Sequence, residues 1–191
     1  MRERINAALE EGIRLRLWLR DEGADTLLAM AERGADCLRA GGKLLFAGNG
    51  GSAGDSQHLA TEFVVRLSAA RERPALAGLA LTTDSSLLTA CANDFSFEMI
   101  FQRQVEALGR PGDLLLALST SGRSPNLLAA ARRARELGLG VLGFLGGDGG
   151  PLAELCDLAL LVPAKDSGRV QELHITAGHL LVELIEQRLY D

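Results

Sequence analysis

Residues 43–54 read Lys43-Leu44-Leu45-Phe46-Ala47-Gly48-Asn49-Gly50-Gly51-Ser52-Ala53-Gly54. The apolar run over residues 43–47 lacks polar alternation, which is typical of a strand buried on both faces of a parallel sheet. The glycines that follow permit a tight turn, and a helix is expected over residues 53–66. This succession of strand, glycine loop and helix predicts one unit of an open α/β fold.

The same alternation continues along the chain. Further short apolar runs occupy residues 76–81, 113–118, 140–145 and 158–162. Two helices are expected in residues 1–40 and a long closing helix over residues 170–189. We therefore predict an α/β fold with a doubly wound, five-stranded parallel sheet flanked by helices. It would form a single domain over residues 1–191, with residues 1–40 as a helical extension and residues 41–191 as the core.

Composition excludes several classes of partner. The chain has 191 residues, 47% hydrophobic and 24% charged, and its formal net charge of -5 gives no general attraction to nucleic acid or to an acidic membrane surface. No apolar run approaches the ~20 residues that span a bilayer, and the charged start is unlike a secretory signal, so we expect a cytoplasmic protein. The three cysteines have no CxxC spacing and indicate neither a disulfide framework nor a zinc ribbon.

The loop after the third predicted strand is rich in hydroxyl groups, with the sequence Ser119-Thr120-Ser121-Gly122-Arg123-Ser124. Ser124 and Pro125 are typical of the N-cap and the first position of a helix, here expected over residues 126–137. Free backbone N–H groups and the positive end of the helix dipole would then face the loop. Such donors can hold a phosphate in an acidic protein, so a phosphate site is predicted. The alternative is an ordinary serine-rich turn.

The glycine loop after the first strand allows two interpretations. Gly48-x-Gly50-x-x-Ala53 matches the dinucleotide-binding fingerprint in its alanine form, which would indicate a Rossmann oxidoreductase. That fingerprint also requires an acidic residue about 20 positions on, at the end of the second strand. Residues at that distance lie in a predicted loop, and the second strand ends later, near Asp84. A glycine loop that lets the backbone approach a sugar fits the sequence equally well.

Two of the three histidines stand beside other polar residues on predicted helices. His58 and Glu62 are four residues apart and share a helix face, and Gln171 and His179, eight apart, roughly share a face of the last helix. His174 should point at least a quarter-turn away from Gln171. These residues form a candidate site. The alternatives are a surface pair for His58 and Glu62 and a hydrogen-bonded core histidine for His179.

Taken together, the motifs resemble those of the phosphoheptose isomerases, a family of the sugar isomerase (SIS) domain superfamily. The matching segments are Gly48-Asn49-Gly50-Gly51-Ser52, His58-x-x-x-Glu62, Ala92-Asn93-Asp94, Ser119-Thr120-Ser121-Gly122 with Ser124, and Arg169-Val170-Gln171-Glu172-Leu173-His174 with His179. They occur in the family's order. The resemblance implies interconversion of sedoheptulose 7-phosphate and D-glycero-D-manno-heptose 7-phosphate, an early step in heptose biosynthesis for cell-surface polysaccharide such as lipopolysaccharide.

The resemblance also implies residue roles. Glu62 is the expected base and His179 the expected acid in an isomerisation through an enediol, each contributing typically ~10²- to 10⁴-fold. The expected substrate-binding residues are Ser119, Thr120, Ser121 and Ser124 for the phosphate, and Asn49, Gly50, Gly51, Ser52, Glu62, Asn93, Asp94 and Gln171 for the rest of the sugar.

Family members can carry zinc, and the matching ligands are His58, Glu62, Gln171 and His179, which implies one zinc ion per subunit. These roles conflict, because a histidine nitrogen bound to zinc has no proton to give and a carboxylate on zinc is a weaker base. Glutamine is also a poor zinc ligand. The resemblance therefore leaves open whether zinc is catalytic or structural. Family active sites lie between subunits of a tetramer, so we expect a homotetramer, with an apolar stripe of Ile5, Leu9, Ile13 and Leu17 helping assembly.

Two features depart from the family. Arg123 replaces a common asparagine and would either tighten phosphate binding or face solvent, and residues 164–168 lack the usual acidic and threonine-containing segment. Two other functions stay open. A non-catalytic member of the superfamily binds the bacterial replication initiator but lacks the catalytic glutamate and histidine, so Glu62 and His179 favour an enzyme. An isomerase of another phosphosugar is the third interpretation, because the phosphate loop does not measure the sugar.

Overall fold

Five parallel strands form one sheet in the order β2-β1-β3-β4-β5. In the computed structural model, which describes residues 1–191, they are β1 Leu44–Gly48, β2 Gly78–Ala80, β3 Leu114–Ser119, β4 Gly140–Gly146 and β5 Leu158–Val162. All residues of β1 and β3 are buried, as expected for central strands covered on both faces. The predicted five-stranded parallel sheet is confirmed.

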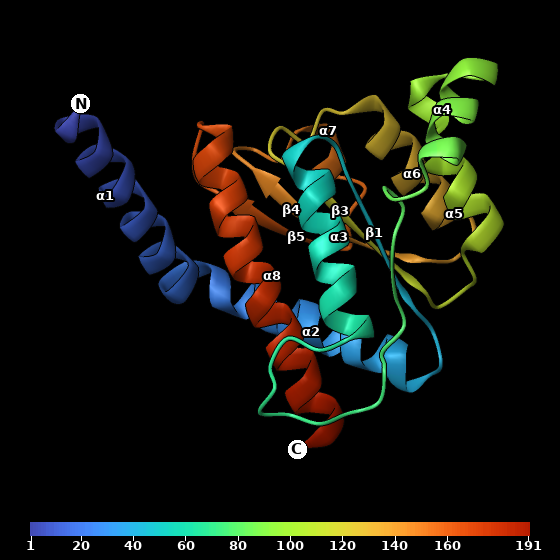
Figure 1. The fold of residues 1–191 in the computed structure, drawn as a ribbon, viewed down its shortest axis with the longest axis horizontal. Helices are drawn as coiled ribbons and strands as arrows, with labels where there is room; N and C mark the ends of the chain where they lie inside the picture. The colour runs from blue at the N-terminus through green and yellow to red at the C-terminus, as the bar shows by residue number, and fades with distance from the viewer.

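Helices cover both faces of the sheet (Figure 1). They are α1 Arg2–Trp18, α2 Ala24–Arg39, α3 Gly51–Val64, α4 Ser85–Asp94, α5 Gln102–Leu108, α6 Pro125–Glu136, α7 Gly150–Ala153 and α8 Ser167–Tyr190. A π-helical turn at Leu19–Gly23 joins α1 to α2. A 3-10 turn at Phe97–Met99 precedes α5.

Alternate side chains of each strand enter two different cores. Leu44 and Phe46 of β1 pack with buried residues of α2, α3 and α8, while Leu45 and Ala47 pack with buried residues of α4, α5, α6 and α7. Successive side chains of a strand point to opposite faces of the sheet. Because hydrophobic layers cover both faces here, consecutive residues of a central strand are all apolar. The sheet is therefore doubly wound, as predicted.

Some predicted boundaries are wrong by a few residues. The edge strand β2 is three residues long instead of six, because the Leu76 N–H donates to the carbonyl of Phe63, 3.0 Å away, and not to the sheet. The closing helix starts three residues early, since Asp166 caps it by accepting the Arg169 N–H at 3.0 Å. The helix expected over residues 53–66 begins and ends two residues earlier, at Gly51 and Val64.

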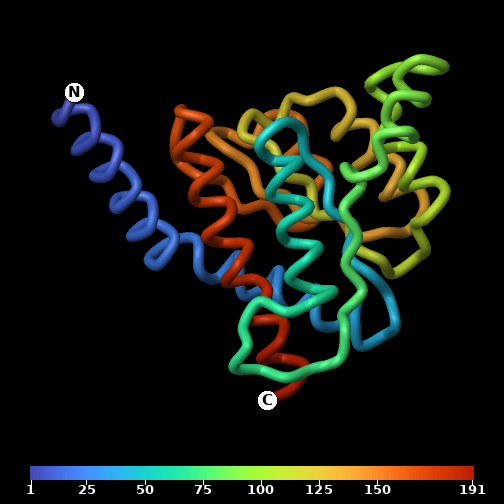
Figure 2. Tube along the Cα trace, viewed as in Figure 1, coloured from blue at the N-terminus to red at the C-terminus, as the bar shows by residue number.

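Helix α1 projects from the rest of the chain, and its N-terminal half stands apart from the other elements (Figures 1 and 2). Only Gly12 and Leu15 of this helix are buried. The four apolar side chains of the predicted stripe remain between 44% and 61% exposed, namely Ile5, Leu9, Ile13 and Leu17. In α2, Leu27 and Ala31 are buried, whereas Leu28 is 42% exposed. None of the helices is both long and apolar enough to cross a membrane.

Candidate active site

The strand order reverses between β1 and β3, because β2 lies on one side of β1 and the later strands lie on the other. In open α/β sheets the loops on either side of such a point diverge and leave a crevice beyond the carboxyl ends of the strands, where ligands bind. The two loops in question are the glycine loop after β1 and the hydroxyl-rich loop after β3. Both predicted binding loops therefore lie at the position where this fold binds ligands.

The hydroxyl-rich loop presents donors that its own structure leaves free. Ser119 Oγ accepts the Gly122 N–H at 3.0 Å, and Ser121 Oγ accepts the Arg123 N–H at 3.3 Å, so each hydroxyl keeps its O–H to donate. Ser124 is the N-cap of α6 with Pro125 in the first turn, but the Ser124 side chain makes no capping hydrogen bond. A phosphate could therefore engage these hydroxyls and the α6 N-terminus together.

The loop after β4 braces the hydroxyl-rich loop from behind. Gly122 has a φ of 62°, and a Cβ there would overlap the carbonyl of Gly149. The Leu152 N–H also donates to the Gly122 carbonyl at 3.1 Å. Arg123 extends outward, 60% exposed, and its Nη2 lies 2.9 Å from an oxygen of Asp148. The backbone N–H of Gly150, followed by Arg123, lowers the pKa of Asp148. Arg123 thus pairs with the bracing loop.

The glycine loop touches α8 through Gln171. Gly50 adopts a left-handed conformation with a φ of 57°, and Gly51 begins α3. A Cβ on Gly51 would collide with the side-chain amide of Gln171. Ser52 is buried and its carbonyl accepts the hydroxyl of Ser56 at 2.8 Å, which rigidifies the first turn of α3. Two predicted sugar-binding segments, separated by about 120 residues in the sequence, are therefore in contact.

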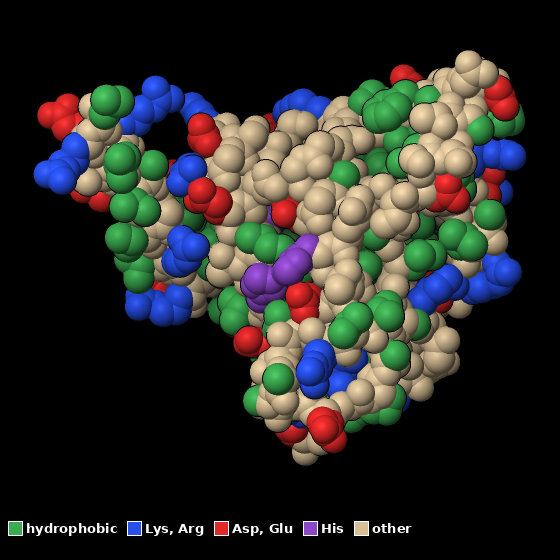
Figure 3. Space-filling view, viewed as in Figure 1, with side chains coloured by type: hydrophobic (Ala, Val, Ile, Leu, Met, Phe, Trp, Pro, Cys, Tyr) green, Lys and Arg blue, Asp and Glu red, His purple; other side chains and the backbone are tan.

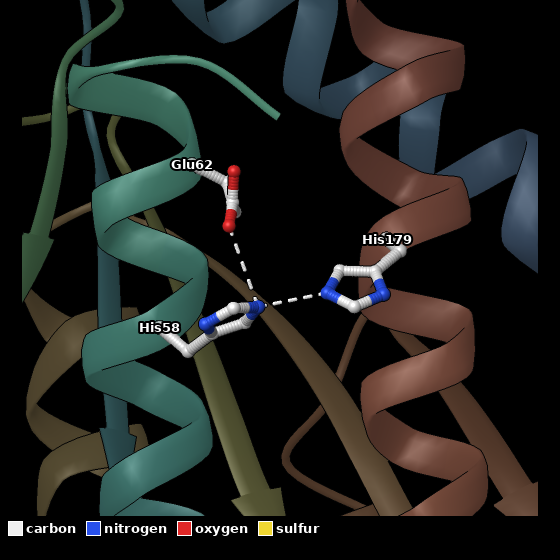
Figure 4. A group of neighbouring side chains, drawn as sticks. All are labelled: His58, Glu62 and His179. Atoms are coloured by element: carbon white, nitrogen blue, oxygen red, sulfur yellow. Dashed lines mark hydrogen bonds and ion pairs between the residues drawn. The ribbon is translucent and has the colours of Figure 1, made fainter. Parts of the chain in front are cut away.

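Two turns further along, α3 and α8 bring both predicted histidines together (Figure 4). The Nε2 atoms of His58 and His179 lie 2.8 Å apart, and His58 Nε2 lies 3.4 Å from Glu62 Oε1. The helices approach closely because Gly178 has no side chain where Leu59 packs. The His58 side chain is 47% exposed and that of Glu62 14%. The space-filling view shows histidine side chains at the surface, where α3 and α8 lie side by side (Figure 3). The site is open to a ligand.

Asp55 is a site residue that the sequence analysis missed. It lies on the same face of α3 as His58 and Glu62, three and seven residues earlier, and that spacing could have indicated it. Burial raises the pKa of Asp55, while a hydrogen bond from the Gln171 amide and the nearby His58 ring act in the opposite direction. One carboxylate oxygen is buried without a partner. Asp55 therefore lies beside the Gln171 amide near the start of α3.

The cluster of His58, Glu62 and His179 has the chemistry and spacing of a metal site. One ligand atom from each residue lies within 4.8 Å of the others. Two nitrogens bound tetrahedrally to zinc at 2.0–2.1 Å are about 3.3 Å apart, so the observed 2.8 Å between the Nε2 atoms would need only a sub-ångström adjustment. The residues therefore fit zinc. The fourth predicted ligand, Gln171, contacts Gly51 and Asp55 in this structure.

Asn93 and Asp94 do not join the cluster within one chain. They end α4, and the Asn93 amide donates to the Asp94 carboxylate at 2.8 Å. Asp94 lines a pocket between α4 and α5. Figure 1 shows α4 on the opposite side of α3 from α8. These two predicted sugar-binding residues therefore lie away from the histidine pair.

The remaining alternatives can be compared with the structure. His174 is fully buried and packs against Phe144, with ring centroids 5.8 Å apart, so it points away from the site as predicted. Asp84, an acidic residue four positions after β2, accepts the Leu87 N–H at 2.9 Å as the N-cap of α4. It is thus engaged where a dinucleotide-binding protein needs a carboxylate for ribose. Together with the histidine cluster, this favours the sugar-binding interpretation of the glycine loop.

Comparison with known proteins shows the family of the chain. A sequence profile of the SIS domain matches residues 9–146, so the fold and site define a SIS-domain protein. A phosphoheptose isomerase from Desulfovibrio desulfuricans is 52% identical over 187 residues, covering 98% of this chain and 88% of the relative. The chain belongs to the phosphoheptose isomerase family and is an isomerase, which confirms the family and the enzyme class predicted from the sequence.

Solved structures support the same assignment. The phosphoheptose isomerase of Neisseria gonorrhoeae superposes with a TM-score of 0.91 at 39% identity, covering 97% of this chain and 98% of that one. A phosphoheptose isomerase from Francisella tularensis gives a TM-score of 0.92 at 34% identity, with 97% of both chains covered. The likeness therefore extends over nearly the whole chain, including the N-terminal helices.

Proposed function

We propose that the chain interconverts sedoheptulose 7-phosphate and D-glycero-D-manno-heptose 7-phosphate through an enediol, in the cytoplasm. The observation that carries this proposal is the convergence of His58, Glu62 and His179 on facing sides of α3 and α8. The names of the relatives support it, since they are phosphoheptose isomerases. An acid, a base and a phosphate loop are the parts that an aldose–ketose isomerase needs.

The substrate would lie along the face of α3 that carries the site. Its phosphate would accept hydrogen bonds from Ser119, Ser121 and Ser124 and from the N-terminus of α6. The sugar would pass Gly51 and Gln171 and reach the histidines, and Gly51 and His58 are seven residues apart, roughly 10 Å along the helix. A longer sugar carries its carbonyl farther from its phosphate, so this separation favours a long-chain phosphosugar.

Proton transfer would divide between two groups. In the direction from ketose to aldose, the Glu62 carboxylate takes a proton from C1 and returns it to C2, while His179 donates its proton to O2 and then takes the proton from O1. The contact between His58 and His179 allows one proton between the two Nε2 atoms, so one ring donates and the other accepts. His58 would thereby orient the ring of His179 and fix which nitrogen carries the proton.

We also propose that His58, Glu62, Gln171 and His179 can hold one zinc ion, with the Gln171 side chain directing its carbonyl oxygen toward the cluster. When bound, zinc would act as a Lewis acid on a substrate oxygen. A ligated histidine cannot donate a proton from the bound nitrogen, so the residues would serve as acid and base only when they are not ligands. Asp55 would keep the Gln171 carbonyl oxygen available by accepting its N–H group.

A homotetramer with sites between subunits is the proposed assembly. The exposed stripe on α1 supports an interface, because four apolar side chains on a projecting helix would otherwise remain in water. Asn93 and Asp94 support a shared site, since α4 is remote from the histidines of its own chain. They would contact the sugar bound to a neighbouring subunit.

The test is an NMR assay of the purified protein with sedoheptulose 7-phosphate and, separately, six-carbon ketose phosphates, each with and without added zinc. Conversion of the seven-carbon sugar alone is the expected result. Conversion of a shorter sugar at equal or greater rate would indicate an isomerase of another phosphosugar. No conversion of any sugar would contradict the isomerase proposal and favour a binding protein, such as one that contacts the replication initiator.

A further inference from the structure

The glycine loop and the phosphate helix are joined by two side-chain amides. Asn49, directly after β1, donates from Nδ2 to Asn126 Oδ1 at 2.9 Å, and Asn126 Nδ2 donates back to Asn49 Oδ1 at 2.8 Å. Asn126 belongs to the first turn of α6 and is only 2% exposed. These are the only side-chain hydrogen bonds between the two loops that flank the reversal of strand order.

The reciprocal geometry determines how Asn49 faces the ligand. Each amide has two N–H groups and an oxygen with two lone pairs, and the pair uses one N–H and one lone pair of each residue. Asn49 therefore keeps one N–H and one lone pair in a fixed orientation. Without Asn126, the Asn49 side chain could rotate or exchange its oxygen and nitrogen positions.

The Asn49–Asn126 pair also fixes the distance between the glycine loop and the hydroxyl-rich loop, which are the two half-sites of the proposed phosphosugar site. Asn126 follows Ser124 and Pro125, so it moves with the donors proposed to hold the phosphate, whereas Asn49 lies two residues before Gly51, which faces Gln171. A phosphorylated sugar must touch both half-sites at once, but inorganic phosphate needs only the hydroxyl-rich loop. A fixed separation of the two loops therefore strengthens binding of a ligand that contacts both loops more than binding of a ligand that contacts only one.

We propose that Asn126 is a positioning residue that aligns the sugar-binding loop with the phosphate-binding helix through Asn49. This inference rests on the proposed phosphosugar chemistry of the site. Asn126 itself does not touch the substrate. It acts by holding Asn49 and by fixing the separation of the two loops.

The experiment compares two ligands by titration calorimetry, sedoheptulose 7-phosphate and inorganic phosphate. For Asn126→Ala, the dissociation constant of the phosphosugar should rise by about tenfold or more, while that of inorganic phosphate stays within about twofold. Asn126→Leu retains the side-chain volume and should behave in the same way, which covers the case in which the alanine variant fails to fold. Asn49→Ala combined with Asn126→Ala should bind the phosphosugar no more weakly than Asn49→Ala alone.

A matched control is Asp113→Asn, which alters a buried polar residue at the opposite, amino-terminal ends of the strands. Asp113 is 2% exposed and accepts the backbone N–H groups of Lys43 and Arg110. It should lower stability without changing either dissociation constant. Equal weakening of both ligands by Asn126→Ala, no weakening of either, or failure of both Asn126 variants to fold would overturn the inference. Wild-type protein that binds the phosphosugar but does not convert it would overturn only the proposed reaction.

Discussion

At the scale of single residues, the contact between the Nε2 atoms of His58 and His179 restricts what the site can do. Two imidazoles 2.8 Å apart cannot both carry a proton on these nitrogens, so the pair holds one proton or a metal ion in its place. Glu62 is the remaining group of the cluster, and its side chain is less exposed than that of His58. A carboxylate beside such a pair is the natural acceptor of a carbon-bound proton.

Glu62→Gln tests the role of this carboxylate. The variant keeps the size and hydrogen-bonding capacity of the side chain but cannot accept the proton, so turnover of sedoheptulose 7-phosphate should fall by at least ~10²-fold. Binding of the phosphosugar should persist, because the phosphate loop is untouched. Stopped assays by NMR give kcat, and calorimetry gives the dissociation constant. Near wild-type turnover would remove Glu62 from the mechanism.

His174 should make stability depend on pH. Burial lowers its pKa to about 4, partly offset by the backbone of Leu145, and neither ring nitrogen makes a well-formed hydrogen bond. The unfolded chain binds a proton near the ordinary value of 6.5, but the folded chain does not. The contribution of neutral His174 to the free energy of unfolding is therefore fully present above pH 6.5 and is lost as the pH falls toward 4. The total loss is about 3 kcal/mol.

The measurement is the urea midpoint from pH 7 to pH 4.5 for wild type and His174→Leu. The leucine variant has no proton to bind, so its midpoint should decline less steeply over this range. Identical slopes for the two proteins would mean that His174 does not titrate differently in the folded state.

The sequence predicted the residues that carry reactive groups better than those that hold them in place. Hydroxyls, histidines and a carboxylate at regular spacing are visible as patterns, because the pattern itself reflects a helix face or a loop. Asn126 and Asp55 act through partners distant in the sequence, Asn49 and Gln171. Only the fold brings these partners together, so periodicity could not pair them.

At the scale of the elements, the position of α3 against α8 determines the site. Gly178 allows contact in the middle of the two helices, and Arg73 ties their C-terminal ends together. Arg73 Nε lies 2.5 Å from Glu186 Oε1 on α8, and both side chains are nearly fully buried. The same guanidinium donates to the carbonyls of Glu62 and Phe63 at 2.6 and 2.9 Å. It thus caps α3 at the turn that carries Glu62.

Arg73→Met should therefore lower the free energy of unfolding by about 3–5 kcal/mol, since Glu186 is left charged and buried without a partner. Adding Glu186→Leu should recover much of this loss, because an apolar pair of similar volume no longer needs solvation. Urea unfolding of the three proteins measures both effects. Arg71→Met is the matched control. Arg71 lies in the same loop as Arg73 but pairs with Asp191 at the surface, so this substitution should change stability little. A similar loss in both single variants would contradict the capping role.

At the scale of the whole molecule, the apolar runs predicted the sheet because each central strand is buried on both faces. The length of β2 could not be predicted, since Leu76 is apolar like a strand residue but bonds to Phe63 in α3. The position of α4 relative to the site could not be predicted from the sequence either. Asn93 and Asp94 carry a family motif, yet nothing in their spacing tells whether they serve the site of their own chain or that of a neighbour.

The projecting helix α1 gives the last prediction, because its exposed stripe has no partner within the chain. Fully burying one Leu or Ile side chain is worth about 1.5–3 kcal/mol, so Leu9→Asp with Ile13→Asp should weaken the proposed tetramer strongly. Sedimentation velocity should then detect smaller species, and turnover should fall with them if Asn93 and Asp94 complete a neighbour's site. Arg4→Asp, on the opposite side of the helix, is the control and should leave assembly intact. An unchanged tetramer in the double variant would place the interface elsewhere.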